Sequence, residues 1–150
     1  MIAVLPCAYL RVSMYLTQAE ILDGIRRPDG TLAVLSAIDQ RVCILARASM
    51  VQTQWASGNP FGWIADSTLP ENCANPSSCR ELKSRCFQRN VVAGVFAAFP
   101  FDSDQAKQLG LCSVCTEDGN TKFVAGRKKM WEALPSYFEL PPWGDLKNDL

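Results

Sequence analysis

Apolar positions recur at helical spacing along most of this chain, and strand-like alternation is scarce. Residues 5–15 are apolar at nearly every position, which predicts a buried helix with Pro6 in its first turn. Further helical patterns begin near residues 17, 36, 76 and 111. We therefore expect a mainly α protein, with one irregular helical domain over residues 1–150 built from about five to seven helices.

Local sequence signals predict where several of these helices begin and end. Thr17 and Glu20 have the capping-box spacing, and Gly24 is placed to stop the short helix that ends near residue 22. Ser36, followed three residues later by Asp39, predicts the start of a longer helix that runs to about residue 55. Asn75 and Pro76 suit the cap and first residue of the next helix.

The segments between these helices carry turn and loop residues. Residues 26–31, with Pro28 and Gly30, predict an exposed reverse turn. Residues 66–78 are rich in Pro, Ser and Asn and predict a loop. Residues 91–101 either extend the preceding helix or form a buried segment. Residues 135–150 contain three prolines among aromatic residues, which predicts an extended tail pinned to the core.

Composition excludes several classes of function. The 15 Lys and Arg balance the 15 Asp and Glu, so no basic excess draws the chain to nucleic acid or to anionic lipid. The sequence contains no His, which excludes Ser/His/Asp and Cys/His catalysis and any zinc site that uses imidazole. The longest run without a polar or charged side chain, residues 91–101, contains Gly94 and Pro100 and is too short to cross a bilayer. We expect a soluble, non-catalytic protein.

The seven cysteines are odd in number, so complete pairing into disulfides would leave one thiol over. The apolar opening has no basic residues before it and no small-residue cleavage pattern, so it does not read as a secretory signal. These observations predict a reducing compartment, cytoplasmic or nuclear.

Two cysteine pairs are candidates for a metal site. Cys112 and Cys115 have a spacing at which two thiolates can share one metal ion, and Cys73 and Cys79 form a second pair at a loop and a helix start. Together they predict a four-thiolate zinc site, although five residues separate Cys73 from Cys79, which is wider than the usual spacing.

Two other interpretations of the cysteines stay open. Reduced Cys is often buried as a small apolar residue, which would explain all seven without a metal. Cys112 and Cys115 could alternatively form a thiol redox switch or the centre of a thiol enzyme. The acidic Glu117 and Asp118 are expected to disfavour a thiolate there.

The C-terminal residues resemble a known family. The Cys112-to-Cys115 motif, Arg127 to Leu134, and the run from Pro135 through Leu140, Pro141 and Pro142 to Trp143 are similar to the C-terminal part of mushroom-type fungal BTB/POZ domain proteins and of related F-box-like proteins. Residues 16–25, 28–31 and 41–47, together with Cys73 and Cys79, resemble the helical stretch that follows the BTB fold in that family.

The resemblance implies an interaction protein, because BTB domains dimerise and recruit protein partners, some of them cullin ubiquitin ligases. The chain departs from the family in one respect: its Met1 stands where the helices after the BTB fold would start, so the BTB fold itself is expected to be absent. From the resemblance and the composition we expect an adaptor or scaffold module with protein partners of unknown identity.

Overall fold

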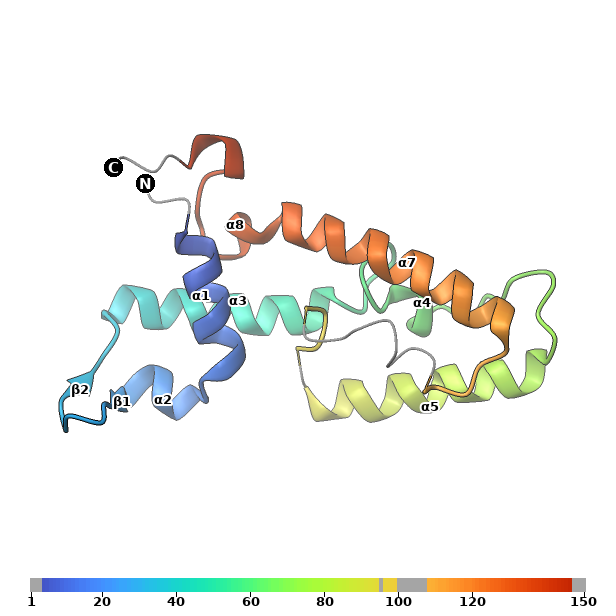
Figure 1. Cartoon of the computed structure of the whole chain (residues 1–150), viewed down its shortest axis with the longest axis horizontal. Helices are drawn as coiled ribbons and strands as arrows, with labels where there is room; N and C mark the ends of the chain where they lie inside the picture. The colour runs from blue at the N-terminus through green and yellow to red at the C-terminus, as the bar shows by residue number, and fades with distance from the viewer. Residues whose placement is uncertain (1–3, 95, 100–107, 147–150) are drawn as a thin grey trace. The chain divides into compact units, whose positions relative to one another are not determined.

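Figure 1 shows the computed structural model, which describes residues 4–94, 96–99 and 108–146. This described part contains seven α-helices, one short 3-10 helix and a two-stranded antiparallel sheet. The prediction of a mainly α protein with an irregular arrangement of about five to seven helices is therefore confirmed.

Contacts between Cα atoms divide the chain into two compact units. Unit 1 comprises Met1–Met50 and Glu132–Leu150, and unit 2 comprises Val51–Trp131. Both boundaries fall inside long helices, α3 (Ala37–Thr53) and α7 (Ser113–Glu132). The expectation of one domain over residues 1–150 stays a prediction.

Unit 1 contains the N-terminal helices, most of α3, the sheet and the C-terminal turns. In addition to α3 its elements are α1 (Leu5–Tyr15), α2 (Gln18–Asp23), β1 (Ile25–Arg26), β2 (Leu32–Ala33), α8 (Leu134–Tyr137) and the 3-10 helix η1 (Trp143–Asp145). The bounds of α1 are those that the sequence pattern predicts, with Pro6 in the first turn.

The start of α2 is the predicted capping box. The hydroxyl of Thr17 accepts a hydrogen bond from the Glu20 amide at 3.1 Å, and the Glu20 carboxylate accepts one from the Thr17 amide at 2.7 Å. At the other end, Gly24 has a φ of +86°, and a Cβ built there would lie 2.6 Å from the carbonyl oxygen of Ala33. Only glycine fits this position, which stops the helix and begins β1.

The predicted turn over residues 26–31 is the end of a β-hairpin. Ile25 pairs with Ala33 and Arg26 with Leu32, while the Asp29 carboxylate accepts from the Thr31 amide at 2.9 Å inside the turn. The sequence pattern missed the strands because two residues each are too few to show alternation.

The prediction of an extended tail over residues 135–150 is wrong for part of its length. Its first residues belong to α8 and a later turn forms η1, since Pro135 is tolerated in the first turn of a helix. Aromatic pinning does occur: Phe138 is buried, and its ring centroid lies 5.4 Å from that of Tyr9. Residues 147–150 lie outside the described part.

Unit 2 contains the end of α3, α4 (Gly62–Ala65), α5 (Pro76–Ala93) and nearly all of α7. Because α5 begins at Pro76, the loop predicted at residues 66–78 ends at residue 75, and Asn75 gives no side-chain cap. Gly94, in the left-handed region, ends α5, and Phe96 and Ala98 beyond it are buried. Residues 91–101 therefore include both a helix end and a buried segment, with residues 95, 100 and 101 outside the described part.

Aromatic rings form the core of unit 2. Phe61 stacks on Trp55 at 5.1 Å and tilts against Phe123 at 5.4 Å, and Phe87 meets Trp55 edge-on at 5.4 Å between ring centroids. The helix α7 can approach these rings closely because glycine stands at two of its buried positions.

The two glycines of α7 mark these close approaches. A Cβ at Gly119 would lie 2.7 Å from the Trp63 ring, and one at Gly126 would lie 2.4 Å from the backbone carbon of Asn59. Both positions lose intrinsic helix stability by carrying glycine, but any larger residue would push the segment of Asn59 and Trp63 away.

Candidate metal centre

The four cysteines that the sequence singled out come together in unit 2. Cys73 lies in the loop after α4, Cys79 in the first turn of α5, Cys112 directly before α7, and Cys115 in the first turn of α7. Their Sγ atoms all lie within 4.8 Å of one another. Cys79 and Cys115 are buried and the other two are half-buried, so the cluster is only partly shielded from solvent.

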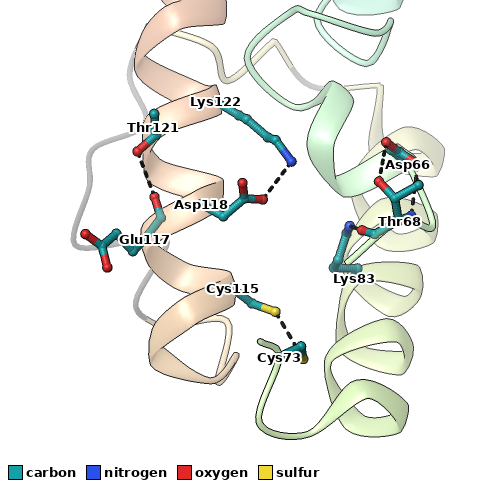
Figure 2. A network of polar contacts seen from close by, with 9 residues as sticks. All are labelled: Asp66, Thr68, Cys73, Lys83, Cys115, Glu117, Asp118, Thr121 and Lys122. Carbon is teal, nitrogen blue, oxygen red and sulfur yellow. Dashed lines mark hydrogen bonds and ion pairs between the residues drawn. The ribbon is translucent and has the colours of Figure 1, made fainter. Parts of the chain in front are cut away.

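The spacing of these sulfurs suits a tetrahedral metal ion. The Sγ of Cys73 lies 3.3 Å from that of Cys115 and 3.8 Å from that of Cys112. A tetrahedron with Zn–S bonds of 2.3 Å has edges of about 3.8 Å, so the cluster needs only small adjustments to enclose zinc. Figure 2 shows Cys115 on α7 directed at Cys73 in the facing loop.

Local backbone structure brings each cysteine to the cluster. The Cys73 amide donates to the carbonyl of Pro70 at 3.0 Å, a turn that directs the loop back toward α5. The carbonyl of Cys112 accepts from the Thr116 amide at 2.9 Å, which begins α7, and the Cys112 amide donates to the Cys79 sulfur at 3.4 Å. Such N–H donors stabilise negative charge on sulfur.

The surroundings of Cys112 favour its thiolate. Backbone amides of Cys115 and Ala74 donate to this sulfur and lower its pKa to about 6. The acids Glu117 and Asp118 therefore do not set the direction of the Cys112 pKa shift, because the amides that donate directly to its sulfur outweigh them.

The two buried cysteines respond in the opposite direction. Burial raises the pKa of the Cys115 thiol, and hydrogen bonds with the thiols of Cys73 and Cys112 raise it further. For Cys79 the Cys112 amide lowers the pKa, but burial together with the neighbouring thiols outweighs it, so the net shift is upward. A divalent cation that entered the cluster would therefore displace protons from these sulfurs.

One residue near the cluster was not predicted from the sequence pattern. Lys83, on α5, is only 7% exposed, and its Nζ donates to the carbonyl of Thr68 at 2.8 Å (Figure 2). Burial lowers the pKa of its amine, and the nearby carboxylate of Asp66 acts against that shift. The only sequence signal was its spacing of four residues from Cys79, which puts both on one helix face.

The other three cysteines do not join the cluster. Cys43 is buried in α3, where burial raises the pKa of its thiol, and Cys7 lies in α1. Cys86 lies on α5, and its sulfur accepts from the Asn90 side chain at 3.5 Å. The interpretation as a buried apolar thiol fits Cys43 best.

Comparison with known proteins identifies no relative: no family model, no curated protein and no solved structure matches this chain. The resemblance to the region after the BTB fold thus stays a prediction. Within the part of the chain that the structure describes, no helix combines the length and apolar character needed to cross a membrane.

Proposed function

We propose that this chain is a non-catalytic protein-interaction module of the adaptor or scaffold kind, whose second unit is stabilised by zinc bound to Cys73, Cys79, Cys112 and Cys115. The observation that carries the metal part is the convergence of four sulfurs, from a loop and two helix starts, within 4.8 Å. Thiolate is a ligand that zinc accepts readily, and four of them complete a tetrahedral shell.

A closed shell of this kind suits structure better than catalysis. Catalytic zinc keeps one position open for water or substrate, whereas four thiolates leave none. The chain also lacks His, the side chain that most often transfers protons near neutral pH. Both features favour a module that is recognised by a partner over one that converts a substrate.

Exposed apolar side chains of unit 1 support a protein partner. They lie in α2, in and after the hairpin, and along α3: Leu22 (51% exposed), Leu32 (54%), Val34 (54%), Ile38 (76%) and Leu45 (48%). A protein surface that exposes a group of apolar residues in this way often marks a contact with another protein. The resemblance to the region after the BTB fold favours the same role.

The proposed compartment is the cytoplasm or the nucleus, where thiols stay reduced and available to zinc. The structure pairs none of the seven cysteines, so all remain available as thiols in such a compartment. The balanced charge makes a protein surface a better partner than nucleic acid or an anionic membrane.

Metal analysis of the full chain, purified without added zinc, tests the proposal. We expect one zinc per chain, lost in Cys79→Ser but retained in Cys86→Ser, which changes another α5 cysteine outside the cluster. Protein that is folded and reduced but contains no metal, and gains none from added Zn²⁺, would contradict the zinc site and favour buried thiols. Cross-linking in cells before purification tests the adaptor role, which predicts a specific protein partner.

A thiol switch is the second candidate, because the Sγ atoms of Cys112 and Cys115 lie within 4.8 Å. Here the Cys112 thiolate would attack one hydrogen peroxide, releasing hydroxide and forming a sulfenic acid, and the Cys115 thiol would then displace water from that sulfur to form the disulfide. Mass spectrometry after mild peroxide treatment distinguishes it: a reversible Cys112–Cys115 disulfide in metal-free protein supports the switch, whereas slow and random oxidation of the cysteines excludes it.

A further inference from the structure

Lys83 lies beside the four-cysteine cluster on the same helix face as Cys79, one turn further along α5. Among the described residues, Lys83 is the only buried one whose side chain is ordinarily charged. A buried ammonium is expensive unless negative charge or hydrogen-bond acceptors compensate it. The position of Lys83 therefore needs a physical reason.

The hydrogen bond from Lys83 connects α5 to the loop that carries Cys73. Its acceptor is the carbonyl of Thr68, and Thr68 is itself fixed by Asp66: the carboxylate accepts from the Thr68 amide at 2.9 Å and from its hydroxyl at 2.6 Å. The segment from Asp66 to Thr68 is thus held rigidly by its own side chains. Figure 2 shows Lys83 reaching this segment from α5 while Cys73 lies further along the loop.

Charge around the cluster gives a second reason. Four thiolates with one divalent ion have a net charge of about −2, which a partly buried site must offset. The groups whose charges act on Lys83 are Asp66, Lys122, Cys115 and Asp118. Of these, Lys122 is paired with Asp118 at 2.7 Å and half exposed, so Lys83 is the cation that stands within the protein beside the sulfurs.

We infer that Lys83 is a positioning residue of the metal site: it fastens the loop of Cys73 to α5 and offsets the negative charge of the loaded thiolate shell. This inference rests on the proposed zinc site. A carbonyl, the carboxylate of Asp66 and that of Asp118, which is already paired with Lys122, compensate a buried ammonium weakly, whereas a metal-bound thiolate shell adds lasting negative charge nearby. Outer-shell partners of this kind orient the ligands and raise metal affinity.

Zinc affinity of full-length variants, measured by competition with a chromogenic chelator, tests this role. In Lys83→Met we expect binding weaker by about 10–100-fold, because both the hydrogen bond and the charge are lost. Lys83→Gln retains a donor without the charge and should lie between Met and wild type, and Lys83→Arg should recover most of the affinity. Arg85→Met is the matched control: it removes one cation from the exposed face of the same helix and should leave the affinity unchanged.

Cobalt substitution adds a readout that general destabilisation would not move. The thiolate-to-cobalt and d–d absorption bands report tetrahedral geometry, and we expect Lys83→Met to alter their position or intensity while Arg85→Met leaves them as in wild type. If Lys83→Met does not fold, Lys83→Gln and Lys83→Arg still test the proposal. Zinc affinity equal to that of wild type in Lys83→Gln would show that the charge of Lys83 has no role.

The outcomes separate the two proposals. Zinc bound by wild type and by all Lys83 variants with equal affinity and equal cobalt spectra would leave the zinc site standing and overturn the role of Lys83. Wild-type protein that binds no zinc would overturn the proposed metal site and, with it, this inference.

Discussion

The interactions that stabilise unit 1 internally differ from those that stabilise unit 2. In unit 1, helix caps and hydrogen bonds tie the elements: Ser13 donates to the carbonyl of Cys43 at 3.3 Å, and the Tyr9 hydroxyl donates to Asp39. In unit 2, an aromatic core is combined with four converging cysteines. Unit 1 should therefore lose stability in small steps, whereas the proposed zinc site would make unit 2 depend on one cluster.

Removal of the metal should produce the largest difference in stability between the two units. Structural zinc contributes on the order of 10 kcal/mol of gross free energy to folding, so a strong chelator should abolish the protection of α5 amides against hydrogen exchange. Amides of α1 and α2 should keep theirs, since no residue of the cluster lies in unit 1. Equal loss of protection in both units would show that they unfold together.

A methyl group added to α7 should also destabilise unit 2 alone. Gly126→Ala places a Cβ 2.4 Å from the Asn59 backbone, and backbone cannot move aside cheaply. We expect a loss of about 2–3 kcal/mol, although alanine is the better helix former. Chemical denaturation measures it, and Gly144→Ala, where no atom lies within 4 Å, should change stability by less than about 0.5 kcal/mol.

In unit 1 the pair of Tyr9 and Asp39 predicts a dependence on pH. The hydrogen bond to Asp39 and burial raise the pKa of Tyr9 to about 12, above its ordinary value of 10.0. A raised pKa means that this stabilisation is complete below pH 10 and is lost as the pH rises through about 12.

Hydrogen bonds from Tyr9 and Ser36 lower the pKa of Asp39, so the same contact should also weaken as the pH falls below 3.8, its ordinary value. Tyr9→Phe should cost about 1.5 kcal/mol at neutral pH and remove the alkaline loss of stability. A Tyr9→Phe variant with the wild-type alkaline profile would show that Tyr9 does not cause it.

The smallest expected effect is at the cap of α2. Thr17→Ala removes the hydroxyl that accepts from the Glu20 amide and should cost about 1 kcal/mol, measured by thermal unfolding. Thr17→Ser keeps the hydroxyl and serves as the control. Because the cap belongs to unit 1, zinc affinity should be the same in both variants, and a weakened affinity would contradict the separation of the units.

Sequence alone could predict the features that depend on neighbours along the chain. The capping box at Thr17, the helix start at Pro76 and the ends of α1 follow from local rules, and the structure has them. The candidate cysteines could also be predicted, because zinc binds few residue types and the absence of His left only cysteines and carboxylates.

The features missed depend on contacts between distant segments. Glycine disfavours a helix by its intrinsic propensity, and the reason for Gly119 and Gly126 in α7 lies in Trp63 and Asn59 on another segment. The burial of Lys83 similarly depends on the loop at Thr68, which nothing in the pattern around Lys83 indicates. Periodicity describes one helix face at a time and says nothing of what approaches it.

The order of the cysteines along the chain has a consequence for synthesis. Cys79 and Cys112 are 33 positions apart, so a ribosome that adds about 5–20 residues each second makes the first half of the proposed site about 2–7 s before it reaches the second half. During that interval Cys73 and Cys79 are two reduced thiols without partners. If the four cysteines bind zinc as proposed, the nascent chain waits for its last two ligands, and an oxidant that reaches it earlier can pair the wrong sulfurs.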